Sequence, residues 1–151
     1  MDKFEEKLEE LFARGYECSQ IMVALGLYCQ GKTNWDLVRS LESLSGGLGY
    51  SGKLCGALTG AACMLGMYAG RGPAEEKSSF DLNTMVRELV EWYEETIGKE
   101  YGGTNCDHIT EHCLDKDELC LPCMSIVTKT YQKVRNILCS RGFNMEKGRC
   151  L

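Results

Sequence analysis

The sequence predicts an all-α protein, a single compact bundle of about six to seven helices with a glycine-rich central helix. Apolar residues recur at three- and four-residue spacing, and no alternating strand pattern of useful length occurs. Only 2 prolines occur among 151 residues, and many of the glycines stand where periodic segments stop. A chain of this length suits one domain that buries a large core without disulfides.

Three amphipathic segments precede the central helix. Asp2 is a suitable N-cap for a first helix, which we expect to end at Gly15. A second helix is predicted over residues 19–30. Thr33 is the expected cap of a third, whose apolar side consists of Trp35, Val38, Leu41 and Leu44.

A glycine cluster and then 17 uncharged residues between Lys53 and Arg71 predict the central helix. A membrane span needs about 20 residues and is richer in large apolar side chains, so we expect a buried helix instead. Gly52, Gly56 and Gly60 recur every four residues, which places them on one helix face. Such a face can admit a neighbouring helix backbone or a bound cofactor.

The clearest helical pattern is the unbroken apolar stripe over residues 82–97. A short helix is expected over 105–114, and Pro122 suits the first turn of a last helix. The predicted domain therefore spans residues 1–139, followed by a loose polar tail over 140–151.

The net charge and the number of cysteines indicate which classes of function and partner to expect. The net charge of −5 disfavours nucleic acid and anionic membranes as main partners. The acidic N-terminal segment is no signal peptide, so we expect a cytoplasmic protein without a membrane span. Thiols are kept reduced in the cytoplasm, and the 10 cysteines therefore indicate metal or redox chemistry more than a disulfide scaffold.

Four cysteines stand in distinctive surroundings. Cys18 opens a Cys-Ser-Gln segment at a helix start, and Cys55 opens the hexapeptide CGALTG after a glycine-rich run. Cys106 ends GGTNC, and Cys123 begins the last helix. Over about residues 5–138 this order resembles the C_GCAxxG_C_C family of redox-active proteins, and it is similar to the non-haem part of split-Soret cytochrome c. The resemblance implies a single domain in which the four cysteines are redox-active. Covalent haem is excluded, because no C-x-x-C-H motif occurs.

The chemistry of four thiols leaves two uses open. Cys18, Cys55, Cys106 and Cys123 can bind an iron–sulfur cluster, or they can cycle between dithiol and disulfide. We favour the cluster, with electron transfer or sensing as its role and an unknown redox partner protein. All but Cys106 lie near expected helix starts, where the positive dipole end lowers the pKa of a thiol. The glycine face is compatible with a homodimer.

A structural zinc module in residues 106–123 is the alternative. Cys120-Leu-Pro-Cys123 also resembles a redox C-x-x-C motif locally, and it leaves open which of its two cysteines is the fourth of the pattern. We choose Cys123, whose distance to the apolar positions of the last helix fits better. The alternate ligands of this module are Cys113, Cys120, His108 and His112.

The remaining cysteines are expected to have no site of their own. We expect Cys29 and Cys63 to pack as small hydrophobes in apolar helices. Cys139 and Cys150 are predicted to be exposed free thiols near the C-terminus.

Overall fold

The computed structural model describes residues 2–77, 81–111 and 121–148. Within these ranges there is no strand, only one isolated antiparallel bridge between Leu54 and Asn105, and the predicted all-α class is confirmed. The helices are α1 (Lys3–Ala13), α2 (Cys18–Cys29), α3 (Trp35–Leu41), α4 (Gly56–Ala69), α5 (Leu82–Tyr93), α6 (Lys99–Tyr101), α7 (Cys106–Thr110) and α8 (Leu121–Ser140). A 3₁₀ turn, η1 (Glu42–Leu44), follows α3, and a π-helical segment, η2 (Glu94–Gly98), joins α5 to α6.

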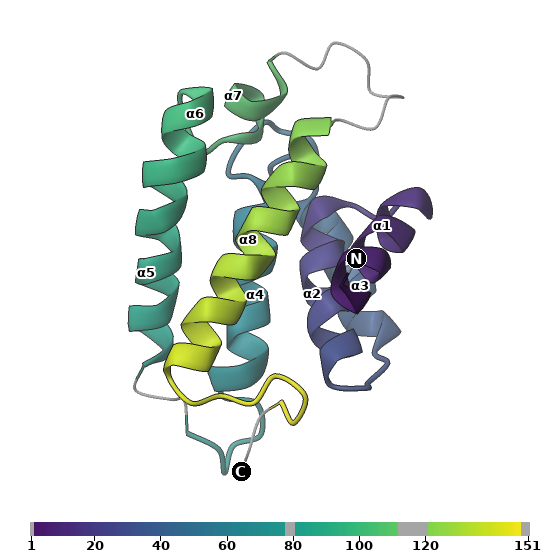
Figure 1. The fold of residues 1–151 in the computed structure, drawn as a ribbon, viewed down its shortest axis with the longest axis vertical. Coiled ribbons are helices and arrows are strands. Elements are labelled where there is room, and N and C mark those ends of the chain that lie inside the picture. The colour runs from purple at the N-terminus through teal and green to yellow at the C-terminus, as the bar shows by residue number, and fades with distance from the viewer. Residues whose placement is uncertain (1, 78–80, 112–120, 149–151) are drawn as a thin grey trace.

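The glycine-rich helix α4 is central, as predicted. It contacts α2, α5 and α8, while α1 and α3 cover the other side of α2 (Figure 1). The core between these helices is formed by fully buried side chains such as Leu25, Met64, Leu89 and Val134. Burial of this apolar surface is the main source of stability. No helix in the described ranges is long and apolar enough to cross a membrane.

Several helix starts follow from local capping. Asp2 caps α1 as predicted, since its Oδ1 accepts a hydrogen bond from the Phe4 N–H at 3.4 Å. The predicted cap of α3 is wrong by one residue. Asn34 rather than Thr33 is the cap, because the Asn34 Oδ1 accepts from the Leu37 N–H at 3.1 Å.

The start of α4 also differs from the prediction. Gly52 has a φ of 76°, a left-handed conformation that ends the preceding loop, and the helix begins only at Gly56. Gly52 therefore does not share a helix face with Gly56 and Gly60.

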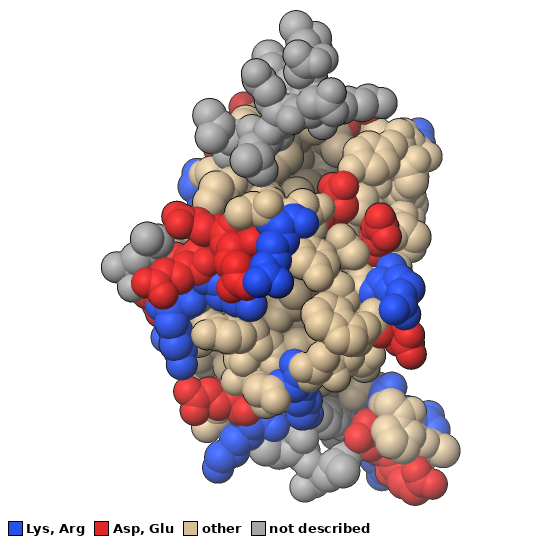
Figure 2. Space-filling model, turned by 90° about the vertical axis from the view of Figure 1, so that its right-hand side faces the viewer, with Lys and Arg blue, Asp and Glu red and all other residues tan. Residues whose placement is uncertain are grey.

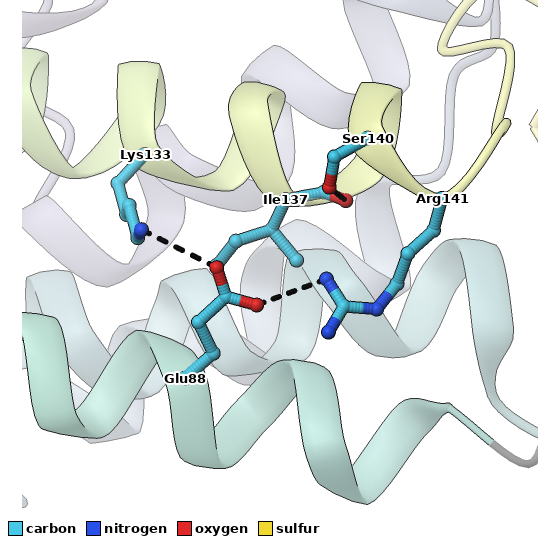
Figure 3. A network of polar contacts seen from close by, with 5 residues as sticks. All are labelled: Glu88, Lys133, Ile137, Ser140 and Arg141. Carbon is cyan, nitrogen blue, oxygen red and sulfur yellow. Dashed lines mark hydrogen bonds and ion pairs between the residues drawn. The ribbon is translucent and has the colours of Figure 1, made fainter.

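The residues that follow α8 pack against the carboxyl end of α4 and the core. The Tyr68 hydroxyl donates a hydrogen bond to the Met145 carbonyl at 2.8 Å, and the side chains of Phe143 and Met145 pack on the core. Glu88 of α5 accepts from Lys133 at 3.4 Å and from Arg141 at 2.9 Å (Figure 3). The described part of the predicted tail thus contacts the core.

Candidate thiol site

The four cysteines of the pattern lie at one end of the bundle. The amino ends of α2, α4, α7 and α8 meet there, together with the carboxyl end of α5 (Figure 1). Cys18 is the first residue of α2 and Cys106 the first of α7. Cys55 directly precedes α4, and Cys123 lies in the first turn of α8.

Backbone hydrogen bonds bring Cys55 next to Cys106. The Cys55 N–H donates to the Thr104 carbonyl at 3.0 Å, and the Cys106 N–H donates to the Lys53 carbonyl at 2.6 Å. The isolated bridge lies between these two bonds. Two cysteines about fifty residues apart in the sequence are therefore neighbours in space, and a negative charge on Cys55 raises the pKa of Cys106.

Cys18 and Cys123 are the most strongly interacting pair. The interaction between the two thiols is the largest influence on the pKa of both. It raises the pKa of Cys18, which keeps its proton, and it lowers the pKa of Cys123, whose thiolate is stabilised by the neighbouring thiol. Burial adds to the increase for Cys18.

Of the thiols expected to have a lowered pKa at a helix start, only Cys123 does, and the cause there is the Cys18 thiol. At Cys55, which is 7% exposed, desolvation of the thiolate outweighs its stabilisation by the Tyr93 hydroxyl and by backbone N–H groups, and the pKa is raised. The pKa of Cys106 is raised first by burial and then by Cys55. Three of the four thiols thus favour the protonated form.

Tyr93 completes the site and was not predicted from the sequence. Its side chain is fully buried, and its hydroxyl has no hydrogen-bond partner among the described residues. Burial and the neighbouring Cys55 raise its pKa, so the hydroxyl stays protonated. The π-helical segment η2 begins at the next residue, and such segments are frequent at functional sites. The only signal for Tyr93 in the sequence was its hydroxyl group within the mostly apolar stripe of residues 82–97.

The three glycines proposed for a cofactor contact the protein itself. A Cβ at Gly60 would lie 2.7 Å from the Ser19 carbonyl oxygen, and one at Gly56 would lie 3.5 Å from the Ser19 N. A Cβ at Gly52 would overlap the carboxylate of Asp107. The contacts with Ser19 belong to the packing of α2 on α4, and a cofactor role for these glycines stays a prediction.

The zinc alternative falls largely on residues that the structure does not describe. His112, Cys113 and Cys120 lie outside the described residues, while His108 is exposed and packs against Gly103. Among the residues that the structure does describe, no group of three or more His, Cys, Asp or Glu side chains is placed to hold a metal ion.

The other cysteines are distributed elsewhere. Cys29 is partly buried, with its Sγ 3.6 Å from the Tyr131 hydroxyl. Cys63 was expected to pack in the core, but it is exposed, because it lies on a side of α4 that its neighbours leave uncovered. Cys139 is exposed as predicted, and Cys150 lies outside the described residues.

Comparison with known proteins agrees with this arrangement. A family model described as "Putative redox-active protein (C_GCAxxG_C_C)" matches residues 16–137, which include all four cysteines of the site. The chain belongs to this family. No curated protein and no solved structure matches it. The C_GCAxxG_C_C description makes the chain a redox-active, cysteine-rich protein and names no cofactor.

Proposed function

We propose that Cys18 and Cys123 form an exchangeable dithiol through which this C_GCAxxG_C_C protein reduces a disulfide of a partner protein. The observation that supports this most directly is that Cys18 and Cys123 lie in the first turns of α2 and α8 and interact, so that one keeps its proton while the pKa of the other is lowered. A thiolate is the attacking species in disulfide exchange, and a neighbouring thiol is needed to resolve the mixed disulfide.

The proposed exchange has two steps. The Cys123 thiolate attacks one sulfur of the partner disulfide, which forms a mixed disulfide and releases one partner thiolate. Cys18 then loses its proton to water, and its thiolate attacks the Cys123 sulfur, which releases the second partner thiolate. Two electrons pass to the partner, and a Cys18–Cys123 disulfide remains.

An iron–sulfur cluster is the second candidate, and one observation favours it. Three thiols from separate segments, Cys18, Cys55 and Cys123, all raise the pKa of Tyr93, whose hydroxyl is a buried donor that could donate to a cluster sulfur or a thiolate ligand. The donor set therefore suits the cluster chemically. Cys18, Cys55, Cys106 and Cys123 would be its ligands, and the cluster would supply one-electron transfer.

One experiment separates the two candidates. Protein purified without oxygen is assayed for iron and acid-labile sulfide, and its cysteine oxidation states are mapped by mass spectrometry after mild oxidation. Cys55→Ser and Cys123→Ser are compared with Cys139→Ser, which changes an exposed thiol away from the site.

The outcomes point in different directions. A Cys18–Cys123 disulfide in metal-free protein, absent from Cys123→Ser and retained in Cys55→Ser, supports the dithiol. Iron and sulfide that are lost in both site variants support the cluster. Metal-free protein whose four site thiols stay reduced under an oxidant that oxidises Cys139 would contradict both.

A further inference from the structure

A groove between α1, α2 and α3 lies outside the thiol site. Its volume is about 280 Å³, and its floor is apolar, with Leu11, Leu27 and Val38 all buried. Three aromatic rings line it: Tyr16, Tyr28 and Trp35.

Two of the aromatic rings of this groove are exposed. Trp35 is 60% exposed and Tyr28 is 41% exposed, so both rings present apolar surface to water. Exposed rings beside an apolar floor are typical of ligand grooves, since a planar ligand can cover the rings and the floor together.

The rim of the groove is cationic although the chain as a whole carries a charge of −5. Lys7, Arg14 and Lys32 face a single carboxylate, Glu10, which pairs with Lys7 and Arg14 at 3.1 Å each. Lys32 makes no ion pair with any residue in the described ranges. Figure 2 shows the side of the molecule that carries α1 and α3, where uncharged surface lies between groups of charged side chains.

We propose that this groove binds a small planar aromatic anion, such as a one- or two-ring carboxylate or sulfonate. Ligand pockets usually measure roughly 300–1,000 Å³, and the groove, at about 280 Å³, is just below that range and suits only a small ligand. The ring of such a ligand would stack on Trp35 over the apolar floor. Its anionic group would pair with Lys32, the rim cation that no carboxylate of the described residues neutralises.

Two dyes with nearly the same ring system test the proposal. Anilinonaphthalene sulfonate is an aromatic anion, and phenylnaphthylamine is its uncharged analogue; both fluoresce more strongly in apolar surroundings. Each is titrated against the full-length protein and against Lys32→Ala and Trp35→Ala. The control variants are Lys129→Ala, which removes an exposed lysine of α8, and Leu48→Ala, which removes an exposed apolar side chain outside the groove.

The charge and the ring should have separable effects. We expect Lys32→Ala to weaken binding of the sulfonate by about tenfold and to leave the uncharged dye unaffected, since only the anion pairs with the ammonium group. Trp35→Ala should weaken both dyes by about fivefold or more. Both control variants should bind like the wild type.

Three results would overturn the proposal. Equal affinity for the two dyes in the wild type would mean an apolar groove without anion preference. Sulfonate binding that is unchanged in Lys32→Ala and Trp35→Ala would place the dye elsewhere. Weakening by Lys129→Ala as strong as by Lys32→Ala would indicate only attraction by general surface charge.

Discussion

Gly60 of α4 packs directly against the backbone of Ser19 of α2, one residue after the first cysteine of the thiol site. A Cβ at position 60 would lie 2.8 Å from the Ser19 Cα, closer than side-chain and backbone carbons approach in proteins. Gly60→Ala should therefore push the two helices apart and lower the free energy of unfolding by about 1–3 kcal/mol. Urea denaturation measures this change.

Gly66 provides the matched control on the same helix. A Cβ there would meet no atom within 4 Å, so Gly66→Ala should stabilise the protein by about 0.5–1 kcal/mol through helix propensity alone. Equal effects of the two substitutions would contradict a close approach of α2 and α4 at Gly60.

The ion pairs of Glu88 predict a pH-dependent contribution to stability. Burial by itself would raise the pKa of Glu88, but Arg141 and Lys133 outweigh it and hold the pKa below its usual range. Glu88→Gln should lower the free energy of unfolding at neutral pH by less than about 1 kcal/mol, because the carboxylate is 39% exposed and solvent screens the pairs.

The sign of the pH effect follows from the lowered pKa. The pairs stabilise the fold above the unfolded pKa of about 4.3, and this contribution is lost as the pH falls through the lower folded pKa. The stability difference between wild type and Glu88→Gln should therefore shrink as the pH falls below about 4.3 and vanish below the folded pKa. Glu91→Gln, on the exposed side of α5, should show no difference at either pH. A difference that persists at low pH would mean that the substitution acts through packing.

The helices could be predicted from the sequence because the spacing of apolar residues and the capping residues are local signals. The apolar stripe of α5 and the cap at Asp2 depend on residues within one or two turns. Errors arose where neighbouring residues compete for one role, as Thr33 and Asn34 do at the start of α3. We expected α4 to start earlier, because Gly52 continues the four-residue spacing of Gly56 and Gly60. The φ of Gly52 is left-handed, which a helix does not allow, and the sequence does not reveal this conformation.

The site itself was less accessible to sequence reasoning. The motif spacing identified its four cysteines as candidates, but the bridge that brings Cys55 to Cys106 involves residues without a strand pattern. The pKa directions were also missed for Cys18 and Cys55, because burial and thiol–thiol contacts depend on tertiary structure. Tyr93 could not be distinguished from a core residue until its hydroxyl was found without a partner.

The coupling between Cys18 and Cys123 predicts which thiol reacts first. Because the Cys18 thiol lowers the pKa of Cys123, Cys123 should be alkylated by iodoacetamide at a lower pH than the other thiols of the site. Cys18→Ala removes the stabilising thiol, so the pKa of Cys123 should rise and its alkylation at pH 7 should slow about threefold or more. Mass spectrometry of the alkylated peptides measures the rates.

Two further variants separate this effect from a change in access. Cys18→Ser keeps a hydrogen-bond donor at position 18 and should restore much of the Cys123 rate. Cys139→Ser should leave that rate unchanged, since Cys139 lies away from the thiol site. If Cys18→Ala and Cys18→Ser gave the same rate as the wild type, the thiol–thiol contact would have no chemical consequence.

Tyr93→Phe tests whether the unpartnered hydroxyl serves the thiols. The hydroxyl makes no hydrogen bond that folding could lose, so its removal should leave the free energy of unfolding unchanged or raise it by about 1 kcal/mol. Tyr68→Phe is the matched control, because the Tyr68 hydroxyl bonds the Met145 carbonyl and its loss should cost about 1 kcal/mol. At the thiol site, the Tyr93 hydroxyl stabilises the Cys55 thiolate and so lowers the pKa of Cys55. Tyr93→Phe should therefore raise this pKa further and slow the alkylation of Cys55 by iodoacetamide, whereas Tyr68→Phe should not. Unchanged alkylation of Cys55 in Tyr93→Phe would mean that Tyr93 is only a core residue.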